Sequence, residues 1–443
     1  MNEPRTNSRD PSDTRAKRDE VTYPIPEPNS FLNYAELRQL ARRRLPRIIF
    51  DFIDRGTEDE HALRRNRNAL DSVRIRPRAL RGGGVRNQAT SLFGQNCDTP
   101  IIVAPTAFAG LVWYQGELEL AKAAAANGMP FCAATEALTP VEEIAAASNG
   151  PIWFQLYLWE KEEFTRDLLE RVWSSGVRTL LVTCDNSVSA NREYNIRSGF
   201  GMPLRYSTRN LCDVAFHPRW ALGVFARYLA TGSVPTFANY PAAYRSSILS
   251  RNTKALRYQP IGWDHIRWIR DLWKGNLILK GILRADDAIL GAKLGADGVV
   301  VSNHGGRNLD GAVAPIEVLA EIVDAVGKQL TVIADSGVQR GSDILKLLAV
   351  GAKAVMIGRG LLYATAVGGS SGASRMVGIL QRELDIALGM SGCNDIGELD
   401  RSLIEMPGVK PMAGWRECRS AVPLPDLDPI PDLDAINSPQ IAS

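Results

Sequence analysis

The sequence contains no run of roughly 18 apolar residues, the length that crosses a bilayer, so it predicts no transmembrane helix. It has no extended lysine and arginine run, and its formal net charge is only +3, which argues against nucleic acid as a partner. The six cysteines are scattered, without C-x-x-C pairs or zinc-like spacing, in a chain too long to need disulfides. We therefore expect free thiols, a cytoplasmic location and no metal site.

The two ends of the chain differ in composition from the middle. Residues 1–29 are polar and proline-rich, without the apolar core of a signal peptide, and we expect a disordered tail there. Residues 423–443 are acidic and proline-rich and predict a second tail. With 443 residues, 45% of them hydrophobic, the chain is long enough for one large or two medium domains.

From residue 100 onward, short apolar runs typical of strands alternate with helical patterns, which predicts a parallel sheet with crossover helices. Most repeats are about 20 to 30 residues long, as a strand, a helix and two loops require. Strands are predicted at residues 100–107, 130–135, 151–158, 179–185, 276–282, 298–304, 330–337 and 354–360. This pattern indicates an α/β fold, a (β/α)8 barrel over residues 100–422, with its catalytic face at the polar strand ends.

Two segments do not fit the strand–helix repeat. About ninety residues separate the fourth and fifth predicted strands, so residues 186–259 form an inserted loop system. Long insertions at this face usually cover the active site or form a binding surface. Before the barrel, an N-terminal segment (30–99) begins with one or two amphipathic helices at 34–55, which would close the lower end of the barrel or pack beside it.

The segment SNHGGRNLDG leaves a buried strand and places His304, Arg307 and Asp310 around a glycine turn. An imidazole can take a proton near neutral pH, and a guanidinium can bind a carboxylate through two hydrogen bonds. A base beside an anion clamp suits a hydroxy acid. The alternative is a turn histidine capped by its polar neighbours, but the clustering at a strand end favours a site.

Glycine-rich ends follow the last two predicted strands, and one of them lies at a predicted helix start. Backbone N–H groups in such turns bind phosphate, and many barrels place a phosphate site there. The candidate residues are Gly337, Arg340, Gly341, Gly358 and Arg359. Taken singly, each glycine could be a tight turn beside an exposed arginine, and the signal alone would also fit an isomerase or aldolase barrel.

Over residues 34–412 the chain resembles the FMN-dependent 2-hydroxy-acid oxidases and dehydrogenases, the family of glycolate oxidase, L-lactate dehydrogenase and (S)-mandelate dehydrogenase. The matching segments are FDFIDRGTED, APTAFAG, WFQLYL, VTCDNSVSANRE, ILKGI, SNHGGRNLDG, DSGVQRGSD and IGRG, in the family's order. The resemblance implies FMN as cofactor and oxidation of an (S)-2-hydroxy acid. A non-catalytic flavin-binding descendant is the other reading, but it gives no reason to keep the charged set described next.

The resemblance also implies roles for five catalytic residues. His304 would take the proton from the substrate, and Asp185 would stabilise the resulting imidazolium. Arg192 and Arg307 would bind the substrate carboxylate, while Tyr157 would hydrogen-bond the substrate oxygen that develops charge.

Further positions would hold FMN by the same resemblance. Lys280 would lie beside the N1/O2 edge of the flavin, where a cation stabilises the anionic reduced form. Gln155 and Thr183 would contact the ring, and Asp335 would hold the ribityl chain. The other cofactor positions implied are Pro105, Thr106, Ala107, Ala134, Ser302, Gly337, Gln339, Gly358 and Arg359.

Three positions depart from the family pattern. Phe52 stands where the family has a tyrosine whose hydroxyl helps to hold the carboxylate. Glu136 occupies a pocket position that is aromatic or small in other members, and it would suit a substrate with a cationic or hydrogen-bonding substituent. Gln339 replaces an arginine expected at the flavin phosphate. An oxygen-using oxidase that acts on a specialised metabolite is therefore an alternative to a mandelate-like or lactate-like dehydrogenase.

The insertion looks most like that of the mandelate and lactate dehydrogenase branch, which meets the membrane there. Its run HPRWALGVF mixes apolar residues with arginine, as a segment at a membrane surface that delivers electrons to quinone would. The alternative is a lid packed on its own barrel. Quinone or oxygen would be the electron acceptor, the location would be cytoplasmic or peripheral on the cytoplasmic membrane face, and the resemblance implies a homo-oligomer, a tetramer.

Overall fold

A computed structural model describes residues 30–81, 83–201, 204–205, 207–232, 234–245, 247 and 256–406. The predicted tails, 1–29 and 423–443, lie outside the described residues. In the described part no helix is long and apolar enough to cross a membrane.

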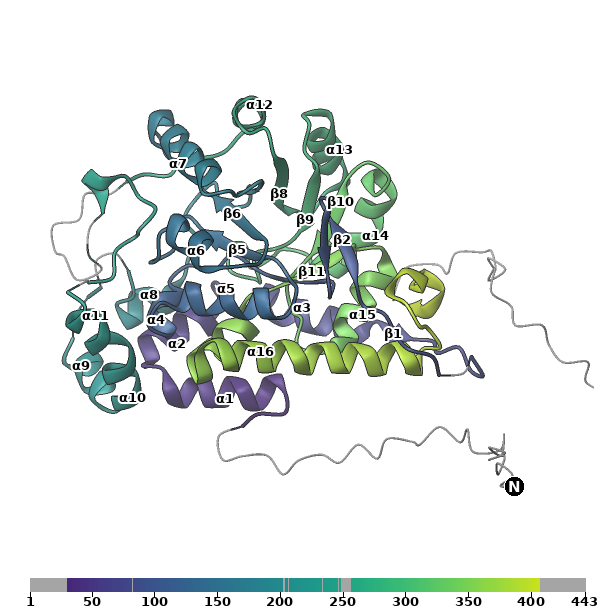
Figure 1. The fold of residues 1–443 in the computed structure, drawn as a ribbon, viewed down its shortest axis with the longest axis horizontal. Helices are drawn as coiled ribbons and strands as arrows, with labels where there is room; N and C mark the ends of the chain where they lie inside the picture. The colour runs from purple at the N-terminus through teal and green to yellow at the C-terminus, as the bar shows by residue number, and fades with distance from the viewer. Residues whose placement is uncertain are drawn as a thin grey trace, which may run out of the picture.

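Within these residues, eight parallel strands close into a barrel in their order along the chain, which confirms the predicted (β/α)8 fold (Figure 1). The strands are β4 (Ile101–Val103), β5 (Phe131–Ala134), β6 (Ile152–Leu156), β7 (Thr179–Thr183), β8 (Asn276–Ile282), β9 (Gly298–Val301), β10 (Thr331–Ala334) and β11 (Ala354–Ile357). Each falls within one predicted strand. They are rich in valine, isoleucine and leucine and almost wholly buried, as parallel strands covered on both faces must be.

Helices that follow the strands along the chain cover the outside of the barrel. They are α4 (Ala109–Val112), α5 (Gly116–Ala126), α6 (Val141–Ala147), α7 (Glu162–Ser174), α12 (Trp263–Leu272), α13 (Ala285–Lys293), α14 (Pro315–Val326), α15 (Gly341–Val350) and α16 (Arg359–Met390). Helix α16 is broken by non-helical backbone at Gly368 and Gly369. Their apolar faces and the outward side chains of the strands share one buried core.

A second, smaller core fills the inside of the barrel. A hairpin of β2 (Thr90–Leu92) and β3 (Gln95–Cys97) contributes to it, and Phe93 at the hairpin turn packs against Trp153 at a ring-centroid distance of 5.6 Å. Trp153 lies near the start of β6, and an added Cβ at Gly298, the start of β9, would meet Phe93 at 2.9 Å. The hairpin therefore closes the N-terminal end of the barrel, which leaves the opposite end for a site.

The N-terminal helices lie beside the barrel. They are α1 (Tyr34–Arg44), α2 (Arg47–Asp54) and α3 (His61–Ser72), and α1 runs along α16 (Figure 1). The second of the two predicted placements for 34–55 is thus the one found. A short antiparallel pair, β1 (Arg74–Ile75) with β12 (Ile404–Glu405), joins the segment after α3 to the C-terminal end of the described fold, near the one-turn helices η3 (Ile396–Glu398) and η4 (Arg401–Leu403).

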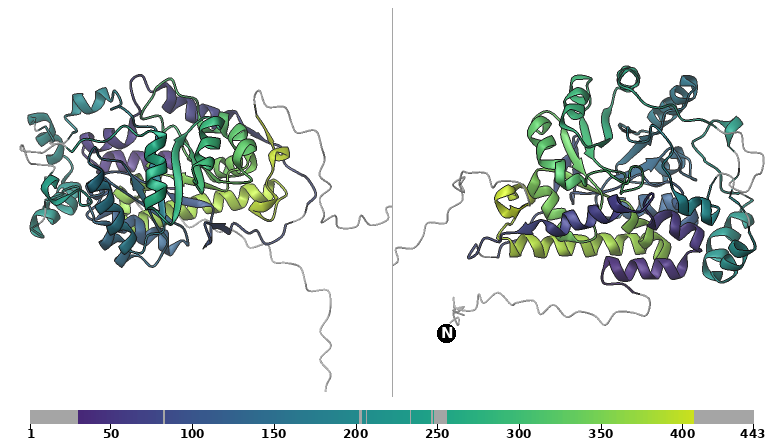
Figure 2. Two further views of the ribbon diagram at one scale, coloured as in Figure 1. Left: turned by 90° about the horizontal axis from the view of Figure 1, so that it is seen from above. Right: turned by 180° about the vertical axis from the view of Figure 1, so that it is seen from behind.

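The insertion between β7 and α12 projects from one end of the molecule (Figures 1 and 2). Its described helices are α8 (Glu193–Ser198), α9 (Thr208–Ala215), α10 (Pro218–Trp220), η1 (Ala221–Phe225), α11 (Ala226–Ala230) and η2 (Ala242–Tyr244). Trp220 and Tyr228 are buried against the barrel, and the Trp220 indole donates to the carbonyl oxygen of Leu111 at 2.6 Å. Leu222 and Leu229 are more than half exposed. The insertion therefore has one face on its own barrel and an apolar face in solvent.

Candidate active site

A cavity of about 520 Å³ lies at the C-terminal ends of the strands. The residues to which the resemblance gives roles in catalysis, substrate binding and cofactor binding line it, except Asp185 and Ser302, which hydrogen-bond to residues that do. Two of the phosphate candidates, Arg340 and Gly341, also lie off the cavity. The predicted residues on its wall are Phe52, Pro105, Thr106, Ala107, Ala134, Glu136, Gln155, Tyr157, Thr183, Arg192, Lys280, His304, Arg307, Asp335, Gly337, Gln339, Gly358 and Arg359. The fold thus brings together residues that lie more than 300 positions apart in the chain.

The turn after β9 presents His304 to the cavity. His304 has a φ of +57°, which is uncommon for a residue with a side chain, and Gly305 and Gly306 continue in the left-handed region. A Cβ at Gly306 would meet the backbone nitrogen of Leu63 at 2.5 Å, so the turn needs glycine there. The backbone N–H of His304 donates to the Ser302 hydroxyl at 3.0 Å, which fixes the turn.

The Nδ1 atom of His304 lies 3.0 Å from Oδ1 of Asp185, the residue two positions after β7. Burial raises the pKa of Asp185, but the His304 ring and Lys280 outweigh it, so its pKa is lowered and it is a carboxylate. A carboxylate can only accept, so Nδ1 carries the proton and Nε2 keeps its lone pair. Burial lowers the pKa of His304 despite this partner, which leaves the ring neutral at pH 7.

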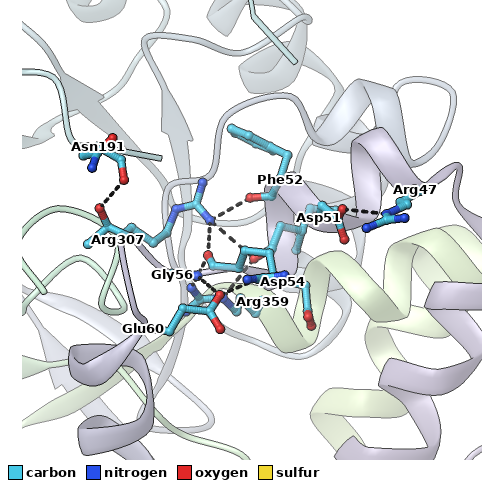
Figure 3. Close-up of polar contacts among 12 residues, drawn as sticks. Arg47, Asp51, Phe52, Asp54, Gly56, Glu60, Asn191, Arg307 and Arg359 are labelled. Carbon is cyan, nitrogen blue, oxygen red and sulfur yellow. Dashed lines mark hydrogen bonds and ion pairs between the residues drawn. The ribbon is translucent and has the colours of Figure 1, made fainter. Parts of the chain in front are cut away.

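Two arginines bind backbone carbonyl oxygens at the C-terminal end of α2 (Figure 3). Arg307 donates from Nη1 to the carbonyl oxygens of Phe52 at 2.7 Å and Arg55 at 3.0 Å, and its Cζ lies 4.9 Å from the Phe52 ring centroid. Arg359 donates to the carbonyl oxygens of Ile53 and Gly305. Burial lowers the pKa of Arg307, and nearby guanidinium groups lower it further. Such a cluster gains free energy from an anion bound beside it.

A third arginine comes from the insertion. Arg192, which precedes α8, donates from Nε to the Arg307 carbonyl oxygen at 3.1 Å and from Nη2 to Asn308 Oδ1 at 3.0 Å. Asn308 in turn donates to the Asp185 backbone oxygen at 2.8 Å. Asn308, which the sequence did not single out, therefore links the arginines to the His304–Asp185 pair.

Lys280 lies on β8 and is 4% exposed. Its Nζ donates to the Ser302 hydroxyl at 3.1 Å and lies 3.6 Å from Oδ2 of Asp335, so the buried lysine has an ion-pair partner as well as a face on the cavity. On the neighbouring strands, the Gln155 amide donates to the Thr183 hydroxyl at 2.9 Å. Fixed polar groups of this kind can bind a polar ring edge.

The structure corrects part of the phosphate site that the sequence predicted. Gly337, Gly358 and Arg359 lie on the cavity, and the first amides of α16 have no acceptor within their own helix. Arg340 and Gly341 do not lie there. The side chain of Arg340 and the amide of Gly341 both donate to the Glu383 carboxylate on α16, because α15 packs against α16 on the outside of the barrel.

Arg67 on α3 lies on the same wall, although sequence reasoning missed it. Its guanidinium donates to the Gly337 carbonyl oxygen at 2.9 Å and pairs with Asp343 and Asp71. Asp343 also accepts from the amides of Gln339 and Arg340. Arg67 thus holds the turn after β10, and a single arginine in a helix gave no signal of that role.

The remaining wall is aromatic. Phe52 stacks on Phe200 with ring centroids 4.2 Å apart, and both contact Phe108. Tyr157 lies next to Tyr258 of the insertion at 5.2 Å. Burial raises the pKa of Tyr157, which therefore keeps its proton and can donate a hydrogen bond. Phe200 and Tyr258 were missed because isolated aromatics in an irregular insertion have no periodic pattern.

A closed barrel with a His–Asp pair and several arginines around one cavity at its C-terminal end is the architecture of a barrel enzyme that acts on an anion. Residues 41–406 match the family of FMN-dependent dehydrogenases. The chain belongs to that family. FMN is its cofactor, and its class of reaction is 2-hydroxy-acid oxidation, which decides against an isomerase or aldolase barrel.

Similar proteins support this family membership. The chain is 39% identical to an L-lactate dehydrogenase of Caulobacter sp. (strain K31), over 83% of this chain and 97% of that one. It is 38% identical to an L-lactate dehydrogenase of Xanthomonas campestris pv. campestris, over 82% and 94%. Among solved structures, monotopic membrane protein (S)-mandelate dehydrogenase superposes with a TM-score of 0.79 at 36% identity, covering 85% of this chain and all of that one.

The residues present fit FMN in three respects. Arg359 and the start of α16 would hold a phosphate, Asp335 would offer an acceptor to ribityl hydroxyls, and Lys280 would offer a cation to a polar ring edge. Gln339 supplies no charge, so Arg359 is the guanidinium that remains on the cavity at this end besides the ion-paired Arg67. No group of His, Cys, Asp and Glu side chains suited to a metal gathers among the described residues.

Proposed function

We propose that this protein oxidises an (S)-2-hydroxy acid, mandelate-like or lactate-like, to the 2-oxo acid, with quinone or another acceptor receiving the electrons. The observation that carries the proposal is the neutral His304, oriented by Asp185, in a cavity lined by Arg192 and Arg307. A base next to an anion clamp is what proton removal from a bound hydroxy acid needs.

Arg192 and Arg307 bind the substrate carboxylate. Among the described residues, Nη1 of Arg192 and Nη2 of Arg307 donate no hydrogen bond, while Nε and Nη2 of Arg192 and Nη1 of Arg307 donate to backbone and side-chain oxygens. Each guanidinium is thus fixed by the protein and has a free donor. A carboxylate bound there also relieves the mutual repulsion of the arginines.

His304 Nε2 accepts the proton of the substrate, and the Asp185 carboxylate stabilises the imidazolium that forms. The Tyr157 hydroxyl donates to the substrate oxygen as charge develops on it. When bound, FMN would accept the two electrons and the second hydrogen that the substrate loses. Lys280 would supply a positive charge to the reduced cofactor, and Ser302 and Asp335 hold that charge in place.

Peripheral contact with an anionic membrane through the insertion is the second part of the proposal. Leu211, Phe216, Leu222 and Leu229 of α9–α11 are 52–84% exposed, and the arginines interspersed with them include the exposed Arg209 and Arg219. Exposed apolar side chains with basic neighbours are typical of a segment that lies in the bilayer interface. A solved relative is described as a monotopic membrane protein.

The test is anaerobic mixing of the purified holoprotein with (S)-mandelate, L-lactate and glycolate, each separately, while the flavin band near about 450 nm is followed. Bleaching by one of these acids supports the proposal, and the fastest acid indicates the substrate branch. Slow recolouring in oxygen but fast recolouring with a quinone analogue indicates a dehydrogenase; fast recolouring in oxygen favours the oxidase alternative. A flavin that no 2-hydroxy acid bleaches contradicts the proposal.

A further inference from the structure

Glu136 is an unusual group for the wall of this cavity. It follows β5 by two residues, and its Oε1 accepts a hydrogen bond from the Tyr258 hydroxyl at 2.6 Å. The Tyr258 hydroxyl also lies 2.5 Å from the Tyr240 hydroxyl. Two tyrosines of the insertion therefore fix Oε1 of Glu136. Oε2 accepts nothing from any described residue and is not enclosed, so it is open to the cavity.

The surroundings of Glu136 are flat and apolar. Phe52 contacts Phe108 at 5.3 Å, Phe108 contacts Phe237 at 5.1 Å, and Phe237 stacks on Tyr240 at 4.6 Å. This row of rings begins beside Arg307, where a substrate carboxylate is proposed to bind, and ends at the tyrosine pair that holds Glu136. Flat apolar walls of this kind favour an aromatic ligand over a small aliphatic one.

Glu136 also lies close to the reaction centre. The Tyr258 ring that holds it packs on Tyr157 at 5.2 Å, and the charge of Arg192 acts on its carboxyl group. Burial raises the pKa of Glu136, more than Tyr258 and Arg192 lower it. One hydrogen bond from the protein does not offset the cost of taking a carboxyl group out of water in an aromatic pocket. A hydrogen-bond donor on the ligand would therefore stabilise Glu136.

Asn195 on α8 adds a second, independent observation. It lines the same cavity, and its Oδ1 is buried without a hydrogen-bond partner among the described residues. Buried polar atoms of native proteins are nearly always paired, so this amide oxygen is an unpaired acceptor in the wall behind the cavity. Neither Glu136 nor Asn195 is needed for the proton transfer and carboxylate binding proposed above.

We propose that Glu136 selects the substrate, and that the substrate is an aromatic 2-hydroxy acid whose ring bears a hydroxyl or amino group that donates a hydrogen bond to Glu136 Oε2. This inference rests on the proposed function and names its substrate class. The donor replaces the water that otherwise solvates Oε2, and the aromatic row encloses the ring.

The test compares kcat/KM for anaerobic flavin reduction by (S)-mandelate and its 3-hydroxy, 4-hydroxy, 4-amino and 4-methoxy derivatives. The methoxy compound has similar bulk but no donor. In the wild type, the better hydroxy compound should exceed the methoxy compound by at least about tenfold, because a lost hydrogen bond to the half-buried Glu136 carboxyl group costs about that much. Glu136→Leu should abolish this ratio, and Glu136→Gln, which keeps an acceptor, should retain part of it.

Glu163→Gln is the matched control, since Glu163 is an exposed carboxylate on α7 and its removal should leave the ratio unchanged. A wild-type ratio near one overturns the inference even if Glu136→Leu fails to fold, and so does an unchanged ratio in a folded Glu136→Leu.

A second readout separates a failure of the Glu136 inference from a failure of the proposed function. The 2-oxo acid products perturb the flavin spectrum on binding, so a wild-type preference for the hydroxylated product would support the Glu136 contact even if no hydroxy acid were oxidised. Equal binding would overturn it.

Discussion

His304 is held by backbone and side-chain contacts at once. Its left-handed φ is held by the Ser302 hydroxyl and the glycines that follow, and its ring is held by Asp185. The strain is local and the compensating hydrogen bonds are short-range, which is how a functional side chain is kept in one orientation. The turn therefore fixes where the base lies, and Asp185 fixes which ring nitrogen is free.

The pH dependence of flavin reduction follows from this environment. Only neutral His304 can accept the proton, and burial lowers its pKa, so kcat/KM should be full at pH 7 and fall as the pH drops below the ordinary histidine value of about 6.5. Asp185→Asn removes the carboxylate that raises the His304 pKa, so the acidic limb should move to still lower pH. The maximal rate should fall about 100-fold or more, because the imidazolium loses its partner. An acidic limb unchanged by Asp185→Asn would contradict this role.

Lys280 has two effects that different measurements separate. Lys280→Met leaves Asp335 buried without its cation, so unfolding of the apoprotein should become easier by roughly 3 kcal/mol. The midpoint potential of the bound flavin should also fall, since a positive charge beside the reduced ring is lost. Lys293→Met, on the outer helix α13, is the control. A lowered stability with an unchanged potential would make Lys280 a structural residue alone.

Much of the site was predictable at the level of single residues, because its members are polar or glycine residues at strand ends, where a parallel barrel gathers them. Arg340 and Gly341 were wrong because they follow the same glycine-rich turn as Gly337, and only the packing of α15 on α16 shows that they face outward. Arg67 was missed because its role depends on tertiary contacts with Gly337 and Asp343.

At the scale of elements, a buried carboxylate joins three helices. Asp54 at the end of α2 accepts from Arg38 of α1 at 2.5 Å and from the Tyr363 hydroxyl of α16 at 2.7 Å. Burial opposes ionisation, but these donors lower the pKa of Asp54. The carboxylate therefore stabilises the fold above the unfolded aspartate pKa of about 3.9, and this stabilisation is lost as the pH falls through the lower folded value.

Asp54→Asn should lower the free energy of unfolding by about 2 kcal/mol at pH 7, the magnitude of hydrogen bonds to a charged group. The difference between wild type and variant should persist down to about pH 4 and shrink below it. Urea unfolding of both proteins at several pH values measures it. A difference that stays constant to pH 3 would show that the carboxylate charge is not the cause.

The exposed apolar face of α9–α11 is expected to bind anionic phospholipid vesicles. Leu222→Glu places a charge on the solvent side of η1 without touching the buried Trp220 or Val224, so binding to anionic phospholipid vesicles should weaken by at least about tenfold. Flavin reduction by the hydroxy acid should not change. Ile386→Glu, at an exposed apolar position on α16, is the control. Vesicle binding that is absent in the wild type, or unaffected by Leu222→Glu, would contradict the membrane proposal.

The strands were predictable because each is a short apolar run between turn residues. The helical patterns that alternate with these runs indicated a strand–helix repeat. The insertion could be located by its length alone. Its structure could not be predicted, because Trp220 and Leu222 are both apolar and only tertiary packing decides that one is buried and the other exposed. The β2–β3 hairpin was missed because its strands are three residues each.

At the scale of the whole molecule, the two ends of the barrel have different tasks. The hairpin and the inner core close the N-terminal end, which contributes stability, and the C-terminal end gathers the charged side chains of several strands around one cavity. The N-terminal helices and the insertion complete that cavity from outside the barrel. We propose that the protein also assembles as a homo-tetramer, which light scattering of the holoprotein would establish.

Single-turnover anaerobic flavin reduction by the same hydroxy acid, in wild type and His304→Gln at equal FMN content, tests whether His304 is the base. The variant should bind FMN and perturb its spectrum with the substrate as the wild type does, yet reduce it at least about 100-fold more slowly, because the base is absent. Reduction at the wild-type rate in His304→Gln would contradict the account, since another group would then have to take the proton.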